Sequence, residues 1–489
     1  MEKTSVKRNF MYQMIYEILI IILPLITSPY IARVIGAEGL GIYSYSYSIA
    51  YYFVLFSMLG LRNYGNRAIA RVRDDQQEMN KTFSDILTLH MLIAVICTAV
   101  YVGYIFLLDE KIYAVIQVFY VISALFDISW FYFGIEKFRT TVTRSSIVRI
   151  ANVVCVFVFV RSANDLWIYC LIMALSQLAS QLALWIPLRR FVKIVRPKWA
   201  DMKVHVKPML ILFIPAVAVS LYKYMDKIML GFISSKVQLG FYENAEKVNN
   251  IPVTIISSFG TVMLPRMSNM AAKGQKKKSE RYTAISMQLV MCLALALAFG
   301  LAAVSTVFAP VFWGAEFIPS GTLIMGLSIT IPFISFANVI RTQYLIPNQK
   351  DRQYVASVIC GAIVNLAINL LLISRLGAVG AMIGTIAAEI TVCVYQAVVV
   401  RKQMPIWSYI KNFAYFILVG ALMFVVVYAF GCRMGTSLST LIWQIVIGVV
   451  IYCALALIYF VRTKNTVVLN MVNGIFKRVK LPFRFGEKN

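Results

Sequence analysis

Charged side chains occur inside two long apolar stretches that follow one another between Pro208 and Arg266. The six charges are Lys223, Asp226, Lys227, Glu243, Glu246 and Lys247. In each stretch their spacing of i, i+3 and i+4 places them on one face of a helix. One charge at the centre of a bilayer costs about 2.5–3.5 kcal/mol even on lenient insertion scales. These faces must therefore meet each other or water.

Two interpretations of the six charges stay open. Three lysines balance three carboxylates, so the charges could form a structural cluster of ion pairs that holds two helices together. Alternatively, they line the polar wall of a transport cavity. We favour the cavity, because ionisable residues inside a membrane generally mark the path of a substrate or an ion.

The composition of the chain requires a membrane protein. Of the 489 residues, 60% are hydrophobic and only 14% are charged, which fits no soluble globular class. About fourteen apolar stretches are long enough to cross a hydrocarbon core about 30 Å thick. The first two lie near 10–35 and 41–61, with a short turn expected at 36–41. The prediction is an all-α polytopic membrane protein with about fourteen transmembrane helices.

The distribution of basic residues predicts the orientation of the chain. When the loops are assigned alternately to two sides, 37 of the 47 Lys and Arg residues fall on one side, six on the other and four within the spans. Positively charged loops remain in the cytoplasm, so both termini are expected there. The net charge of +26 is explained by this asymmetry and by contact with anionic membrane lipids, and nucleic acid is not expected as a partner.

An internal repeat divides the chain. The string GLGIY at 39–43 returns as QLGFY at 238–242, and the pairing of Arg139 with Asn152 returns as Arg352 with Asn365. Each copy has six helices. Because six is an even number, both copies begin on the same side of the membrane and have the same orientation. The expected parts are an N-lobe, a C-lobe, a further pair of helices and a basic amphipathic cytoplasmic tail, at 1–200, 201–405, 406–464 and 465–489.

No catalytic or metal-binding pattern is present in the sequence. It contains no phosphate-binding glycine loop, no GxSxG string and no Cys or His spacing typical of a metal site. The loops are short, which argues against a membrane sugar polymerase as the enzymatic alternative. We expect a transporter without a cofactor. A proton or sodium gradient could drive it, with Glu17, Asp226 or Glu246 as the carrier.

The chain resembles a known family over essentially its whole length, most specifically near its N-terminus. The strings PLITSPYIARVIGAEGLGIYSYSYSIAYYF and LGLRNYGNRAIAR, between Lys7 and Arg71, resemble the polysaccharide transporter family of oligosaccharide flippases (Wzx-like) in the MOP superfamily. The resemblance implies two six-helix lobes around a central cavity in the bacterial cytoplasmic membrane. It also implies that undecaprenyl-pyrophosphate-linked repeat units are moved from the inner to the outer leaflet by alternating access, for capsule, O-antigen or exopolysaccharide biosynthesis. A polysaccharide polymerase and chain-length proteins would be partners.

Two alternatives belong to the same superfamily. A lipid II flippase should carry several arginines in the cavity half of its first two helices, where this chain offers Glu17 and Arg33. A MATE-type cation-coupled exporter should present acidic groups without counter-charges, whereas the charges here balance.

The expected site combines cations, carboxylates and aromatic rings. Lysine ammonium groups attract phosphate without requiring a fixed geometry, carboxylates keep such lysines charged, and tyrosine rings stack on sugars. The expected substrate-binding residues are Lys223, Lys227, Lys247, Arg33, Arg341, Tyr43, Tyr47 and Tyr51. The charge-balancing or coupling residues are Glu17, Asp226, Glu243 and Glu246.

Overall fold

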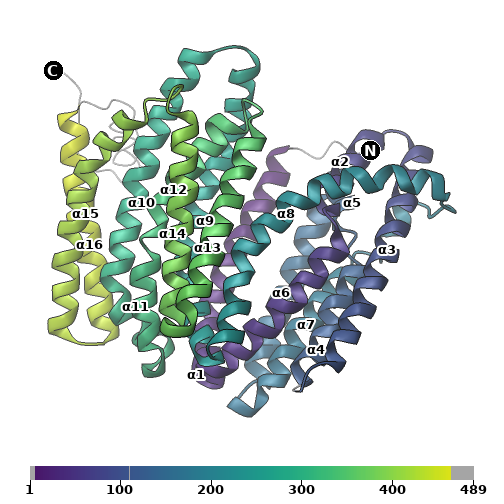
Figure 1. Ribbon diagram of the computed structural model, residues 1–489, viewed down its shortest axis with the longest axis horizontal. Helices are drawn as coiled ribbons and strands as arrows, with labels where there is room; N and C mark the ends of the chain where they lie inside the picture. The colour runs from purple at the N-terminus through teal and green to yellow at the C-terminus, as the bar shows by residue number, and fades with distance from the viewer. Residues whose placement is uncertain (1–5, 110, 464–489) are drawn as a thin grey trace. The chain divides into compact units, whose positions relative to one another are not determined.

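The computed structural model of the protein describes residues 6–109 and 111–463, and within them it is built of α-helices without a strand. Figure 1 shows the helices in chain order. They are α1 (Val6–Met58), α2 (Leu61–Val72), α3 (Gln76–Phe106), α4 (Ile112–Leu125), α5 (Ser129–Gly134), α6 (Phe138–Phe159), α7 (Leu166–Leu182), α8 (Trp199–Ile233), α9 (Lys236–Ala272), α10 (Lys276–Trp313), α11 (Ile318–Leu327), α12 (Thr330–Ile340), α13 (Asp351–Leu376), α14 (Ala378–Val400), α15 (Ile406–Met434) and α16 (Leu438–Arg462).

The helices expose apolar side chains on the faces that do not pack against protein. On α16, Gly448, Tyr452 and Ala456 repeat every four residues and are buried, whereas Val449 and Val450 are 57% and 60% exposed. Water would be a poor solvent for such a surface, and hydrocarbon chains are a good one. The protein is therefore an integral membrane protein.

Length and hydropathy identify ten helices of the described part as candidate membrane spans, or eleven when the bent pair formed by 315–327 and 330–345 is taken as one. These eleven correspond to expected spans. The other three expected spans, the two halves of α1 and the helix α9, are not among the candidates found in the described residues. The fold class is confirmed, but the count of fourteen is not.

The first two expected spans are joined more tightly than we predicted. Two helices meet within α1 at Gly36, whose φ of 69° lies in the left-handed region, so the turn expected at 36–41 is a kink at a single non-helical residue. The predicted hairpin of charged helices is confirmed, with α8 ending at Ile233 and α9 beginning at Lys236.

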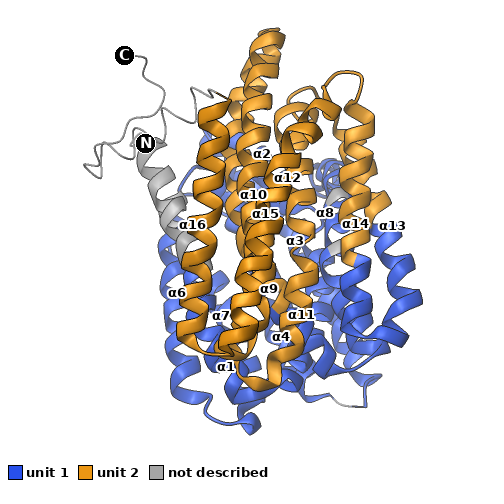
Figure 2. Cartoon of the chain, turned by 90° about the vertical axis from the view of Figure 1, so that its left-hand side faces the viewer, with its two compact units in different colours: residues 1–244, 362–384 blue, residues 245–361, 385–489 orange. Residues whose placement is uncertain are grey.

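Contacts divide the chain into two compact units, which Figure 2 shows in blue and orange. Unit 1 comprises residues 1–244 and 362–384, and unit 2 comprises residues 245–361 and 385–489. This division by contacts does not test the lobes expected from the repeat, whose boundaries stay a prediction. The expected amphipathic tail at 465–489 lies outside the described residues.

Each unit has its own apolar core. In unit 1, Trp130 and Phe131 of α5 pack against Phe83 of α3, and α2 approaches so closely that a Cβ at Gly65 would overlap the Trp130 ring. In unit 2, α10, α15 and α16 lie side by side (Figure 1) around a core to which α12 also contributes.

Candidate functional site

An ion pair joins α8 to α9 inside unit 1. The ammonium group of Lys227 lies 2.7 Å from Oε2 of Glu243, and both side chains are nearly buried, at 12% and 11% exposure. Ser44 of α1 donates a hydrogen bond of 2.8 Å to the same carboxylate oxygen. The carboxylate thus neutralises the lysine and also fixes the position of α1. Breaking a buried pair of this kind leaves an uncompensated charge.

Asp226 accepts several hydrogen bonds in the same unit. Its carboxylate accepts hydrogen bonds from Asn369 at 2.6 Å, from Tyr242 at 3.2 Å and from Asn365 at 3.4 Å. Asn369 also donates to the side-chain oxygen of Asn365 at 3.2 Å. Hydrogen-bond donors therefore surround this buried carboxylate.

Asn369 gives this network an unusual feature. Its side-chain oxygen is buried and has no hydrogen-bond partner within the described part of the chain. The oxygen lies against Gly384 of α14, where any Cβ would overlap it. Glycine at 384 thus makes room for the amide oxygen of Asn369, while the amide nitrogen of the same side chain donates to Asp226.

The structure therefore separates the charges that we expected to act together. Asp226 accepts hydrogen bonds from α13 and from Tyr242 of α9, while Lys227 pairs with Glu243 of α9. Lys223 is exposed. Glu246 and Lys247 are half-buried and belong to the part of α9 in unit 2.

The remaining expected cations lie elsewhere. Arg33 is exposed on α1, and Arg341 lies in unit 2 with its guanidinium 5.5 Å from the centre of the Tyr354 ring. The side chain of Glu17 lies outside the described residues. The structure thus brings Lys227, Asp226 and Glu243 into polar networks of unit 1, and it places Arg341 in unit 2.

The tyrosine stripe of α1 forms part of an aromatic stack in unit 1. The ring of Tyr47 stacks on Tyr120 of α4, with centroids 4.9 Å apart, and Tyr51 stacks on Tyr224 of α8 at 3.9 Å. Tyr43 is buried beneath Tyr47 and the edge of Tyr169. In this structure the rings stack on one another, so access for a sugar would require some of them to separate.

The repeated strings meet each other in unit 1. A Cβ at Gly41 of GLGIY would overlap the carbonyl oxygen of Lys236, and a Cβ at Gly240 of QLGFY would overlap the carbonyl oxygen of Ala37. Only glycine allows two helix backbones to approach so closely. The crossing of α1 and α9, and with it the contact between Ser44 and Glu243, depends on this pair of glycines.

The amides of α13 are site residues that we did not predict as such. Asn365 and Asn369 are four residues apart and therefore share one helix face. They sit in a strongly apolar span, which is the signal that could have identified them, because unpaired amides are unfavourable in hydrocarbon. Tyr242 and Ser44 gave no comparable signal.

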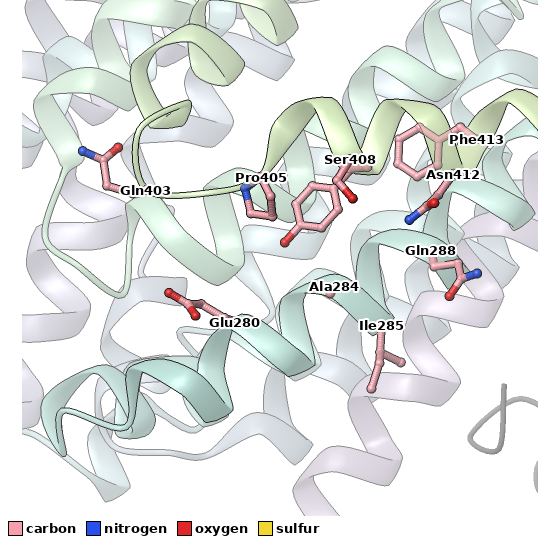
Figure 3. A pocket seen from close by; sticks show the side chains of 10 residues that line it. Glu280, Ala284, Ile285, Gln288, Gln403, Pro405, Ser408, Asn412 and Phe413 are labelled. Carbon is pink, nitrogen blue, oxygen red and sulfur yellow. The ribbon is translucent and has the colours of Figure 1, made fainter.

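A separate pocket of about 460 Å³ lies in unit 2 between the beginnings of α10 and α15. Figure 3 shows that α10 contributes Glu280 and Gln288, while Gln403 precedes α15 and Asn412 lies on it. Glu280 is exposed. Within the described residues, no group of three or more His, Cys, Asp or Glu side chains could hold a metal ion, in this pocket or elsewhere.

Comparisons with known proteins agree with the membrane fold. The chain is 24% identical over 386 residues to a Shigella dysenteriae protein named "Putative O-antigen transporter". The match covers 77% of this chain and 96% of that protein. It is 24% identical over 418 residues to an Escherichia coli K12 protein of the same name, covering 82% and 98%.

A solved structure of lipid II flippase MurJ in an inward closed conformation resembles the fold. The TM-score is 0.78 at 16% identity, and the match covers 92% of this chain and 99% of MurJ. The family described as polysaccharide biosynthesis protein matches residues 6–271, which is more than half of the chain and includes both repeated strings and the Lys227–Glu243 pair. The chain belongs to the polysaccharide biosynthesis protein family.

Proposed function

We propose that this protein is a flippase that moves lipid-linked oligosaccharides from the inner to the outer leaflet of the bacterial cytoplasmic membrane. The substrate would be a repeat unit on undecaprenyl pyrophosphate, used for O-antigen, capsule or exopolysaccharide biosynthesis. The similarity to two proteins named as O-antigen transporters supports this proposal, together with the family match. The fold alone does not discriminate among transporters, since MurJ shares it at only 16% identity.

The structural observation that carries the proposal is the ion pair of Lys227 and Glu243 beside exposed Lys223. A purely structural cluster would pair every lysine internally. Here one ammonium is held by a carboxylate, while the other, one helical turn away, is presented outward on the same helix. An exposed ammonium on an apolar helix is well suited to attract a pyrophosphate.

Within this proposal, Lys223 makes the first contact with the pyrophosphate, and Lys227 exchanges Glu243 for the phosphate as the substrate enters. Lys247, Arg33 and Arg341 are the further cations of the proposed path. Tyr43, Tyr47 and Tyr51 would stack on sugar rings once their own stack opens.

Energy coupling is proposed at Asp226. A monovalent cation prefers oxygen ligands, and the network offers a carboxylate together with the amide oxygens of Asn365 and Asn369. The Asn369 oxygen has no hydrogen-bond partner among the described residues, so it is available as a ligand. Sodium at this place would exchange amide hydrogens for ion contacts, and a proton would occupy the carboxylate itself.

The orientation and partners follow from the same proposal. Both termini would lie in the cytoplasm, the two repeats would rock in alternating access, and a polymerase with its chain-length proteins would receive the product in the outer leaflet. The protein would have no enzymatic activity of its own.

The proposal is tested by expression in a host that lacks its own oligosaccharide flippase. Wild-type protein should restore surface polysaccharide, measured with a sugar-specific lectin, and should reduce the lipid-linked precursor that accumulates in the inner leaflet. Restored export in hosts that make different repeat units would define the accepted sugars. Failure in every host at normal abundance in the membrane would reject the proposal.

A further inference from the structure

Helix α14 carries an acidic residue on its buried face in unit 2. Glu389 is 9% exposed, and Val392, Cys393 and Gln396 follow it at helical spacing on the same face. Val392 and Cys393 belong to the apolar core of unit 2. A Cβ at Gly361 of α13 would overlap Val392, so the two helices are tightly packed one turn from the carboxyl group.

Glu389 has no counter-charge in the described part of unit 2. It forms no ion pair with the Lys or Arg residues of α10, α12, α13 or α15, and no hydrogen bond to its carboxyl group is found. The titratable group near Glu389 is the thiol of Cys393, which lies one helical turn away on α14. Glu389 thus differs from Asp226, which receives three hydrogen bonds, and from Glu243, which is paired with a lysine.

The environment of Glu389 selects the protonation state of its carboxyl group. An ionised carboxylate inside a membrane without a partner costs several kcal/mol, and a protonated carboxylic acid avoids most of that cost. The neutral acid is therefore the stable form in this conformation. The carboxylate becomes stable only when α14 meets water or a cation, so release of the proton requires the surroundings of the residue to change.

We propose that Glu389 is a proton-binding site of unit 2 that takes up and releases one proton during the transport cycle. The reaction is the reversible addition of a proton from the aqueous phase to the carboxylate, with no other group transferred. This inference rests on the proposed transport function, and it assigns to that function a site that is distinct from the network of Asp226.

The protonation of Glu389 can be measured without transport. In purified full-length protein in lipid nanodiscs, the infrared C=O band of a protonated carboxylic acid should be present at neutral pH and absent in E389Q. E280Q is the matched control, because it makes the same change of Glu to Gln at an exposed position of unit 2. If E389Q does not fold, E389D serves instead, since its acid band should shift in frequency. Identical spectra of wild type and the folded variant would overturn the proposal.

The coupling role has its own measurement in proteoliposomes. A pH gradient should accelerate flipping by the wild type and by E280Q, whereas E389Q should flip at one rate with or without the gradient. An E389Q variant that responds to the gradient like the wild type would overturn the coupling role. If the wild type flips no oligosaccharide, the transport proposal fails, and the infrared band still decides whether Glu389 binds a proton.

Discussion

Ser44 donates a hydrogen bond of 2.8 Å to Glu243, the residue 199 positions further along the chain. Gly41 and Gly240 are also 199 positions apart, and each packs against the backbone of the other's helix. Reciprocal contacts between equivalent positions are what a two-fold axis between two copies of one motif produces. The duplication inferred from GLGIY and QLGFY thus has a direct structural counterpart at the crossing of α1 and α9.

This crossing should not tolerate a larger residue. G41V is expected to lower the stability of the protein in detergent by more than the roughly 1–3 kcal/mol of ordinary overpacking, because the obstacle is a backbone carbonyl that cannot rotate away. Thermal unfolding followed by fluorescence measures the loss. G103A is the control, since nothing lies within 4 Å of that position. Equal stability of the two variants would refute the close approach.

A double-mutant cycle separates the structural from the transport role of the Lys227–Glu243 pair. K227Q alone removes the lysine partner of a nearly buried carboxylate and should cost about 3–5 kcal/mol. E243Q in the same chain removes that charge and should restore most of the stability, whereas D226N should not, because the carboxylate that lost its lysine is that of Glu243. Urea or thermal unfolding gives the stability of the wild type, the two single variants and the double variant.

The same double variant tests the role of the pair in transport. The double variant K227Q/E243Q is expected to be folded and impaired in export. If it exports like the wild type, the pair only holds the helices together.

The network around Asp226 should sense monovalent cations. Sodium should raise the melting temperature of the wild type relative to potassium or choline at equal ionic strength, because a ligand that binds only the folded state stabilises it. D226N should lose this response and should also be less stable by about 1–3 kcal/mol, since buried donors lose their acceptor. Y242F is the control, because it removes one hydrogen bond to Asp226 but leaves the carboxylate in place. It should lose less stability than D226N. A sodium response that persists in D226N would place the ion elsewhere.

Labelling of single cysteines tests the predicted orientation. In a variant without its native cysteines, a cysteine replacing exposed Lys276 should be protected from an impermeant maleimide in intact cells and should react in inverted vesicles. A variant that retains only Cys432, which is exposed at the end of α15, should show the opposite pattern. Ready labelling at position 276 from outside would reverse the topology.

The sequence sufficed for the fold class because its signals are strong and local. Apolar length identifies a membrane helix independently of any partner. A turn was expected at 36–41, but its restriction to Gly36 could not be predicted, because glycine is equally compatible with a loop and with a single left-handed residue between two helices.

The candidate site could be predicted only in part. Intramembrane Lys227, Asp226 and Glu243 stand out by their charge, so their importance could be inferred. Their partners depend on tertiary packing, which local spacing does not encode: Asn369 lies 143 residues from Asp226, and Ser44 lies on another helix. For the same reason, spacing along one helix could not predict that Lys227 pairs with Glu243 while Asp226 accepts hydrogen bonds from α13.

The most direct test of the proposed function uses purified protein in liposomes with lipid-linked oligosaccharide in the outer leaflet. Loss of access to an added oligosaccharide-cleaving enzyme reports movement to the inner leaflet, and empty liposomes give the background. The account predicts rapid movement with wild-type protein and at least tenfold slower movement with K223Q, whose exposed position leaves folding intact. Movement no faster than in empty liposomes with wild-type protein would contradict the account.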